Sequence, residues 1–434
     1  MFFRHPDRAH GLRLGYCLNV HPADDLAGLH RGLETVTLPL RDTLAGEGLG
    51  SSFGVGLYLS APVARQLLRS ERELERLARV LGENDLDPFT YNAFPAEGFH
   101  RTGLKRDVFR PTWAEPERLA FTRDVAELAV RLAGPTARGH LSISTHTGGH
   151  ETHATDPGLC PDFDSAVRDG LLESAEHLAE LEQSSGQTLI LSLEPEPRSH
   201  HGDTAAFARA AERWNLAAHP AAGHLGLCLD TCHAAVEFES RSDLAALPAR
   251  TARPLGKIQY TSALRLESPA TDAAGRSALL ALDEPTYLHQ LTAREQDGSL
   301  LRLADLAEFG SSPLRERLLA AEEWRCHFHV PVDLERSALT GGLATTAPLV
   351  DPILCDLLGP VGDAWIQNTP PRATAPELHL ELETYTWSVL PGAGARTSAD
   401  LIRGLAAEYR ATLAHLAATG WHPARNPEPK NLGT

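Results

Sequence analysis

Several features that mark particular classes of protein are scarce in this sequence of 434 residues. Its six cysteines lack paired spacing, which argues against a disulfide framework and favours a reducing compartment. No stretch approaches the roughly 18 consecutive apolar residues of a membrane-spanning helix. Charged residues occur within the first eight positions, where a signal peptide needs an apolar segment close by. We therefore expect a soluble, cytoplasmic protein without a membrane span.

A surplus of basic residues is also absent. Lys and Arg number 40 against 57 Asp and Glu, which gives a formal net charge of −17. Broad binding of a phosphate backbone needs clustered cations, so this charge argues against a nucleic-acid partner. The remaining composition, 42% hydrophobic and 22% charged, is that of a globular protein with a large core.

Short apolar runs rich in β-forming residues recur along the chain, and helical patterns such as 164–182 and 398–419 lie between them. This alternation predicts βαβ units and a parallel sheet. Eight units over this length favour a closed (β/α)₈ TIM barrel, because the segment YCLNVHP lacks the Gly-rich phosphate fingerprint of a doubly wound sheet. The predicted strands are 12–21, 55–60, 88–95, 141–147, 189–197, 225–233, 257–263, 325–332 and 378–387.

Nine candidate strands are one more than a TIM barrel needs. We assign the extra one, which is 325–332 or its neighbour, to a loop-borne excursion near the barrel mouth. The sequence then predicts a single barrel domain over 1–420, with insertions near 265–300 and 333–376 where Pro, Ala, Thr and Gly are frequent. Residues 421–434 have the composition of a flexible tail.

The active site of a TIM barrel lies at the carboxyl ends of its strands, so the polar residues there are the candidates for chemistry. Alternation places Glu194 and Glu196 on one strand face, and His327 and His329 on another. We expect Glu381 to point away from Glu383, into packing or solvent. Mixed carboxylate and imidazole ligands favour Zn²⁺ or Mn²⁺, with Fe²⁺ and Mg²⁺ as alternatives. The candidate metal ligands are Glu194, Asp230, His233, Gln259, His327, His329 and Glu383.

A single polar strand end is explained equally well by exposure to solvent, so the metal hypothesis rests on the whole set.

Other residues around the mouth are candidates for binding substrate. Lys105 is either an anchor for a substrate anion or an ordinary surface lysine, and His146 lies in a His-rich loop that is either a ligand source or a polar rim. The predicted substrate-binding residues are His100, Lys105, His146, Glu196, Tyr385 and Trp387.

The motifs LEP (193–195), LDTCH (229–233) and LET (382–384) resemble signatures of the xylose-isomerase-like TIM-barrel superfamily. That group contains sugar isomerases, epimerases and metal-dependent apurinic endonucleases. The resemblance implies metal or catalytic roles for Glu194, Asp230, His233 and Glu383. Gln259 stands where the family usually has a ligating histidine. The pair His327 and His329 resembles extra ligands of the endonuclease branch.

A longer series of motifs resembles one group within that superfamily, the EboE-type metabolite traffic proteins. The resemblance runs from residue 16 to about 391 and includes NAFPAEGFH, LCLDTCHAAVEFE, GKIQYTSAL, WRCHFHVPV and LELETYTWSVLP. It implies a role in moving precursors of secondary metabolites, with a small metabolite and other proteins of that pathway as partners.

Three functions are compatible with these residues. The leading hypothesis is a metal-dependent isomerase or epimerase of a small hydroxy-carbonyl or sugar-like metabolite, in which Glu194 and Glu383 transfer the proton. The second is a metabolite-binding protein without turnover, which the substitution at Gln259 favours. The third is a metal-dependent phosphodiesterase, which the His pair favours and the negative charge disfavours.

Overall fold

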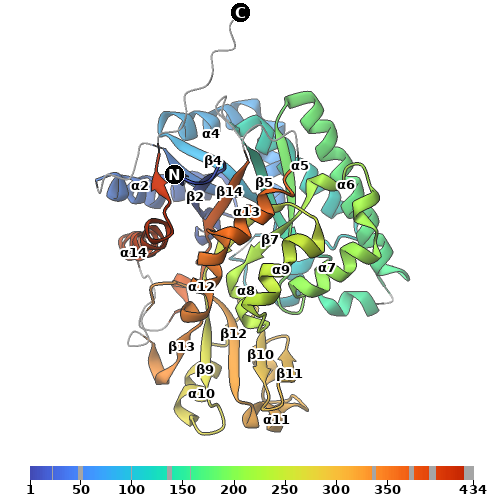
Figure 1. Ribbon diagram of the computed structural model, residues 1–434, viewed down its shortest axis with the longest axis vertical. Helices are drawn as coiled ribbons and strands as arrows, with labels where there is room; N and C mark the ends of the chain where they lie inside the picture. The colour runs from blue at the N-terminus through green and yellow to red at the C-terminus, as the bar shows by residue number, and fades with distance from the viewer. Residues whose placement is uncertain are drawn as a thin grey trace, which may run out of the picture.

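A closed barrel of eight parallel strands forms the body of the protein (Figure 1), as predicted. The computed structural model describes residues 1–424 except 22, 47–51, 99, 134–138, 157, 335–338, 371–375 and 391–396. Each strand pairs with the next in the chain, and the last pairs with the first, which closes the ring. The strands are β2 (Gly11–Cys17), β3 (Phe53–Tyr58), β4 (Leu86–Asn92), β5 (His140–His146), β6 (Thr188–Glu194), β7 (Leu225–Asp230), β8 (Leu255–Tyr260) and β14 (Glu377–Leu382).

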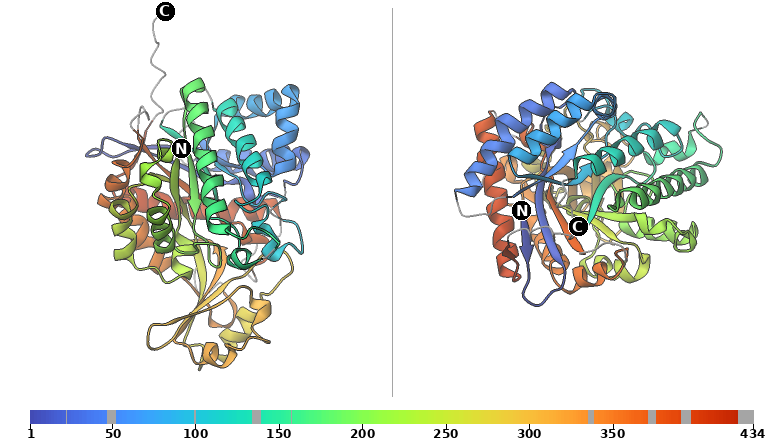
Figure 2. Two further views of the ribbon diagram at one scale, coloured as in Figure 1. Left: turned by 90° about the vertical axis from the view of Figure 1, so that its right-hand side faces the viewer. Right: turned by 90° about the horizontal axis from the view of Figure 1, so that it is seen from above.

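Helices surround the barrel, which is clear when it is viewed along its axis (Figure 2). α6 ends at Gly186, whose φ of 74° lies in the left-handed region that favours glycine. No helix among the described residues is long and apolar enough to cross a lipid bilayer. The helices are α1 (Leu26–Gly32), the π-helix η2 (Leu33–Thr37), α2 (Leu38–Ala45), α3 (Ala61–Arg69), α4 (Glu71–Glu83), α5 (Pro116–Leu132), α6 (Phe163–Ser185), α7 (Thr204–Arg213), α8 (Thr231–Val236), α9 (Arg241–Thr251), α12 (Ala347–Leu357), α13 (Pro360–Ile366) and α14 (Ser398–Ala418).

A second sheet extends from the carboxyl end of the barrel after β8 and forms the lower part of Figure 1. We call the segment 262–345 the lobe; it has an apolar cluster of its own. Its strand order is β11-β10-β12-β9-β13, so the extra predicted strand lies here. The elements of the lobe are β9 (Ser262–Glu267), α10 (Ala273–Leu280), β10 (Leu291–Arg294), β11 (Leu300–Leu303), α11 (Arg315–Ala320), β12 (Glu323–Val330) and β13 (Ala344–Thr345).

The lobe differs in extent from the two insertions expected near 265–300 and 333–376. It is one continuous excursion, and the chain has returned to the barrel by α12. Val350 and Leu354 of α12 join the apolar core of the barrel, and so does Trp365 of α13. Because the stretch 333–376 is rich in Pro, Ala, Thr and Gly, we interpreted it as an insertion and did not predict the helices α12 and α13.

The other end of the barrel is closed by a short antiparallel pair, β1 (Phe2–Arg4) and β15 (His422–Pro423). Trp421 is buried, and its Nε1 donates a hydrogen bond to the Leu358 carbonyl oxygen at 2.9 Å. The part of the expected flexible tail that is described, 421–424, is therefore held by the barrel. Residues 425–434 lie outside the described residues.

The interior of the barrel is unusually polar for this fold, whose core is commonly filled by branched aliphatic side chains. Lys257 and Glu381, both fully buried, form an ion pair at 2.6 Å beneath the mouth. Gly56 makes room for this pair, because a Cβ atom there would lie 1.6 Å from Glu381 Oε1. Nearer the other end, Arg13 bonds Glu377 at 2.6 Å. Paired charges thus occupy space that apolar side chains fill elsewhere.

The buried ion pair predicts a stability effect. Lys257→Met leaves the Glu381 carboxylate in the core without its partner and should lower the free energy of unfolding by about 3–5 kcal/mol. The double variant Lys257→Met/Glu381→Leu should recover most of this loss because no unpaired charge remains. Urea denaturation of the metal-free protein measures both. Equal stability of the single variant and the unaltered protein would contradict this assignment.

Candidate functional site

Three carboxylates from different parts of the chain meet at the carboxyl end of the barrel. Glu194 ends β6, Asp230 ends β7, and Glu383 directly follows β14. One oxygen of each lies within 4.8 Å of the other two, and all three side chains are buried. We call these residues the carboxylate cluster. Their convergence follows from closure of the barrel, because alternation along each strand points all three inward.

Asp230 also explains the position of His233. It is the N-cap of α8, and its Oδ1 accepts a hydrogen bond from the backbone N–H of His233 at 2.8 Å. This capped turn carries the His233 ring into the mouth three residues after the strand ends. The second oxygen, Asp230 Oδ2, is buried without a hydrogen-bond partner among the described residues.

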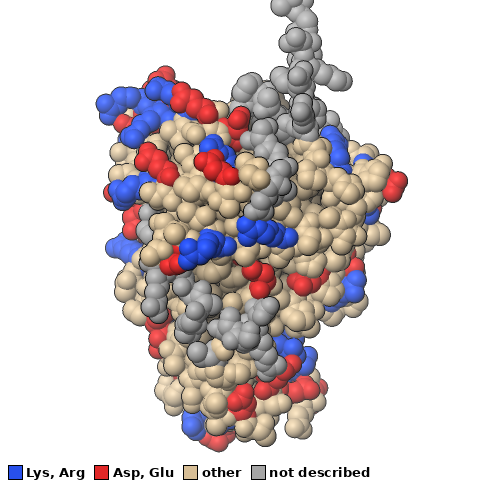
Figure 3. Space-filling view, turned by 90° about the vertical axis from the view of Figure 1, so that its left-hand side faces the viewer, with Lys and Arg blue, Asp and Glu red and all other residues tan. Residues whose placement is uncertain are grey.

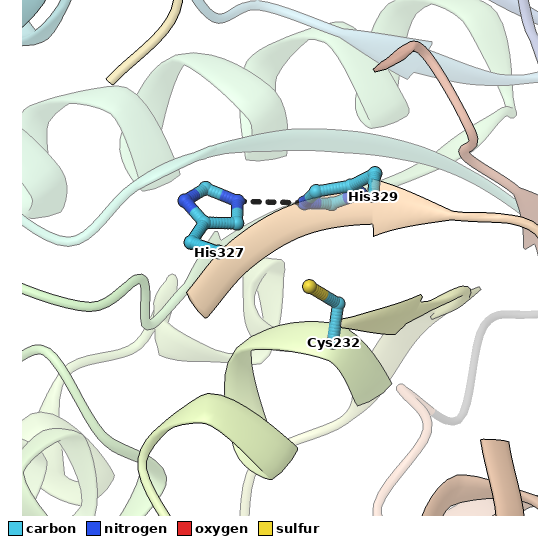
Figure 4. Close-up of side chains that lie close together, drawn as sticks. All are labelled: Cys232, His327 and His329. Carbon is cyan, nitrogen blue, oxygen red and sulfur yellow. Dashed lines mark hydrogen bonds between the residues drawn. The ribbon is translucent and has the colours of Figure 1, made fainter. Parts of the chain in front are cut away.

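His233 and two histidines of lobe strand β12, His327 and His329, form a second group that we call the imidazole cluster. Their Nε2 atoms are separated by 3.1 Å (His233–His327), 3.2 Å (His233–His329) and 2.9 Å (His327–His329). Figure 4 shows the two β12 rings side by side, with the Cys232 sulfur nearby. The lobe therefore supplies two of the three rings.

The other ring nitrogens decide which atoms carry protons. Nδ1 of His233 lies 3.2 Å from the Pro195 carbonyl oxygen, and Nδ1 of His329 lies 2.9 Å from that of Glu383. Nδ1 of His327 lies 2.5 Å from Gln290 Oε1. Since all three partners can only accept, each Nδ1 must donate its hydrogen.

Three unprotonated Nε2 lone pairs consequently face one another. Burial lowers the pKa of His329 to about 3 and lowers those of His233 and His327 well below the ordinary value, so the rings are neutral. In this tautomer none of the three Nε2 contacts, including the one drawn as a dashed line in Figure 4, has a hydrogen to share. A spacing of about 3 Å matches nitrogens that share a divalent cation with bonds of about 2.1 Å. The imidazole cluster is therefore able to hold a metal ion.

The carboxylate cluster also contains ligand atoms that lack a hydrogen-bond partner among the described residues. Oε1 of Glu383 accepts hydrogen bonds from Asn19 at 2.8 Å and Asn92 at 3.1 Å, but its Oε2 has no partner among the described residues. Buried carboxylate oxygens without a donor are costly unless a cation satisfies them. The unpartnered oxygens of Glu383 and Asp230 both belong to this cluster, which is able to hold a cation too.

Burial and mutual repulsion raise the pKa values of these carboxyl groups. The pKa of Glu194 rises to about 7 mainly through burial, although Lys257 opposes the shift. Burial and the neighbouring Glu194 raise the pKa of Glu196 to about 8. The expectation that Glu381 points away was wrong: two residues before Glu383, it shares the inward face of β14 and pairs with Lys257.

Gln259 lies inside the barrel at the end of β8. Its Oε1 accepts a hydrogen bond from the Cys228 thiol at 2.9 Å, and its Nε2 is buried without a partner among the described residues. As oriented, the amide presents no free ligand atom comparable to the imidazole nitrogens. Cys228 thus competes for the one oxygen with which Gln259 would bind a metal.

Two of the predicted substrate-binding residues line the partly open space at the two clusters, which we call the chamber and which has a volume of about 30 Å³. Oε1 of Glu196 accepts from Gln290 Nε2 at 3.0 Å and lies 3.8 Å from His327 Nδ1. The ring of Tyr385 lies against that of His329 with centroids 4.6 Å apart. Trp387 lines a neighbouring cavity instead.

The remaining predicted residues have structural partners. Lys105 donates to Asp305 at 2.8 Å and to the Glu284 carbonyl oxygen at 2.6 Å, so it joins its loop to the lobe and its ammonium group is not available for a substrate anion. His100 bonds the Asn19 carbonyl oxygen at 2.7 Å and lines the cavity of Trp387. His146 lies at the end of β5 with its ring against Phe94 and Phe109.

Sequence reasoning missed three residues that shape the site. Asn19 follows β2 and Asn92 ends β4, so the strand-end rule that found Glu194 also applies to them. Gln290 directly precedes β10 in the lobe. Its Nε2 donates to Glu196, which leaves Oε1 to orient His327, and no pattern in the sequence signals this role.

Removal of one ring tests the imidazole cluster. His327→Ala should weaken Zn²⁺ binding by at least about 100-fold. Gln290→Leu removes the acceptor that fixes the tautomer of His327 and should weaken binding by about 10–100-fold. Isothermal titration calorimetry measures both. His219→Ala, outside the mouth, should bind like the unaltered protein. Unchanged affinity of His327→Ala would rule out this metal site.

The raised pKa values of Glu194 and Glu196 predict how metal affinity depends on pH. In the metal-free protein these groups retain protons up to about pH 7 and 8. Cation binding must displace those protons, so affinity should rise from pH 6 to about pH 8 and then level off. Glu196→Gln should flatten the upper part of the rise. Titrations in buffers of different ionisation enthalpy count the protons released, and zero release at pH 7 would contradict the argument.

No family model and no curated protein matches this chain. Among solved structures it is similar to a xylose isomerase-like TIM barrel protein from Mycobacterium smegmatis in complex with magnesium, with 12% identity, a TM-score of 0.45, and coverage of 94% of this chain and 97% of that one. A xylose isomerase domain protein from Alicyclobacillus acidocaldarius has 13% identity, a TM-score of 0.41 and coverage of 94% and 99%. A xylose isomerase domain protein from Planctomyces limnophilus has 15% identity and a TM-score of 0.31; the match covers 48% of this chain and 65%, less than two thirds, of that one. These likenesses concern the fold alone.

Proposed function

We propose that the protein binds divalent cations at the barrel mouth and catalyses isomerisation or epimerisation of a hydroxy-carbonyl or sugar-like metabolite. One observation carries the proposal. Two buried carboxylates from different strands, Glu194 and Glu383, lie within 4.8 Å of each other beside three converging imidazole lone pairs. An acid–base pair beside a cation site is the requirement of proton transfer next to a carbonyl group.

The imidazole cluster and the carboxylate cluster are the residues that would hold the metal. Their mixture of nitrogen and oxygen ligands favours Zn²⁺ or Mn²⁺, with Fe²⁺ as an alternative, and disfavours Mg²⁺ as the imidazole number rises. A bound ion polarises substrate oxygen atoms and thereby acidifies a neighbouring C–H bond.

Charge balance supports divalent ions at this site. The five carboxyl groups of Glu194, Glu196, Asp230, Glu381 and Glu383 are buried near a single buried ammonium group, that of Lys257. If all are ionised, the excess of four negative charges equals the charge of two divalent cations. An uncompensated excess of this size would be very costly to bury.

The chain's own residues would move the proton. A carboxyl group whose pKa is raised to about 7, as in Glu194, accepts and releases protons near neutral pH. One carboxylate takes the proton from the hydroxyl-bearing carbon beside the carbonyl group. The C–H electron pair forms a C=C bond, and the carbonyl π pair moves onto oxygen to give an enediolate. The other carboxyl group then returns a proton to carbon. Asn19 and Asn92 hold one oxygen of Glu383 and leave the other for this role.

The cellular role belongs to the same proposal. The ordered motifs from residue 16 to about 391 resemble EboE-type proteins, so we assign the reaction to metabolite traffic in the cytoplasm, with other proteins of that pathway as partners. The support for this assignment is the motif series alone.

Phosphodiester hydrolysis is a second candidate, and the imidazole cluster favours it. The net charge of −17 argues against a nucleic-acid substrate. On the face in Figure 3, acidic and basic side chains are interspersed without a continuous basic stripe. Absence of nicking of an abasic duplex by the metal-loaded protein would eliminate this candidate.

Solvent exchange tests the leading proposal. The Mn²⁺- or Zn²⁺-loaded protein is incubated in D₂O with a panel of aldoses, ketoses and hydroxy-ketones, and NMR follows deuterium incorporation at carbon. Glu194→Gln and Glu383→Gln should each slow incorporation by about 10²–10⁴-fold, because each removes one proton carrier.

Glu182→Gln is the matched control, since Glu182 is buried on α6 away from the mouth, and exchange should be unchanged in it. Exchange at the normal rate in both site variants would refute the mechanism. A compound that raises the melting temperature without exchanging would instead identify a binding protein without turnover.

A further inference from the structure

The chamber at the two clusters is small and partly open. Its volume of about 30 Å³ gives room for only about two water molecules. Glu194, Glu383, His329 and Tyr385 are among the residues around it, and bound ions would take up part of the space. A substrate therefore places only a small part of itself inside the chamber, and the rest of the molecule lies outside it.

Tyr385 also lines a second, larger cavity. The cavity measures about 440 Å³, within the range of about 300–1,000 Å³ typical of small-molecule sites. Val20, Val36, Leu401 and Trp387 give it apolar walls. One side is formed by α1 and the π-helix η2, and a π-helix is a local irregularity often found at functional sites.

The cavity carries one positive charge and no carboxylate among its described lining residues. Among the described lining residues Arg31 is the only Lys or Arg; its side chain is exposed and forms no ion pair with a described residue. The two lining histidines, His21 and His100, have pKa values lowered mainly by burial and are neutral at pH 7. In a protein with a net charge of −17, a cavity of this charge favours an anion.

We propose that the substrate has two parts: a small hydroxy-carbonyl head in the chamber, and a weakly polar tail with an anionic end in the cavity. The inference rests on the proposed function for the head and extends it by naming the tail. Tyr385 is the wall along which the two parts are joined, and Arg31 receives the anionic end. A free small sugar lacks such a tail and should therefore bind more weakly than a tailed substrate with the same head.

A series of bipartite probes tests this proposal by calorimetry on the Zn²⁺-loaded full-length chain. Acetohydroxamate represents the head alone, and ω-carboxyalkyl hydroxamates with two to eight methylene groups add a tail of increasing length. Affinity should rise by at least tenfold over acetohydroxamate once the chain reaches Arg31. Phosphonate-ended probes of that length show which anion is preferred.

Two variants separate the cavity from the metal site. Thr35→Trp fills the cavity from an exposed lining position and should abolish the tenfold gain without changing acetohydroxamate binding. Thr43→Trp is its control, because Thr43 is an exposed helical threonine with the same i−4 backbone bond but lies outside the cavity. Arg31→Gln should weaken the carboxylate-ended probe but not its methyl ester, and Arg72→Gln should change neither.

The outcomes distinguish the two proposals. If acetohydroxamate binds and no chain length improves on it, or if the gain survives Thr35→Trp, the two-part substrate is refuted and the metal site stands. If acetohydroxamate fails to bind the Zn²⁺-treated protein, the proposed function fails, and this inference fails with it.

Discussion

The chemistry available at the barrel mouth depends on three hydrogen bonds in which an imidazole Nδ1 donates to a carbonyl oxygen. The acceptors belong to Pro195, Gln290 and Glu383, so the backbone after β6 and β14 and one lobe amide set the tautomers. Because these acceptors do not titrate, the direction of every Nε2 lone pair is determined by the fold. The capacity of the imidazole cluster to hold a cation follows from this constraint. The neighbouring carboxylates are the groups that would transfer protons beside such a cation.

The sequence predicts the barrel and the convergence of its strand ends because both follow from local patterns. Alternation alone places Glu194 inward, and the two-residue spacing places His327 and His329 on one face. The same rule, correctly applied, would have placed Glu381 beside Glu383. The role of Lys105 depends on a partner about 200 positions away, Asp305, and the lobe's true extent depends on which core α12 joins. No local pattern contains that information.

Polarity inside the barrel links the fold to the site. Glycines such as Gly56 leave space for long charged side chains, and Lys257 pairs with Glu381 directly below the carboxylate cluster. In a barrel packed with aliphatic residues, these carboxylates would lie on a floor of low dielectric constant. Here the floor of the mouth is itself charged and hydrogen-bonded. Residues buried inside the barrel therefore set the electrostatic environment of the mouth.

The split origin of the imidazole cluster has a consequence for how the protein is made. His233 leaves the ribosome almost a hundred residues before His327 and His329, and Glu383 comes later still. A metal site made of both clusters would be complete only when the lobe has folded and β14 has closed the ring. A cation held by all of these residues would therefore be acquired by the folded protein and not by the nascent chain.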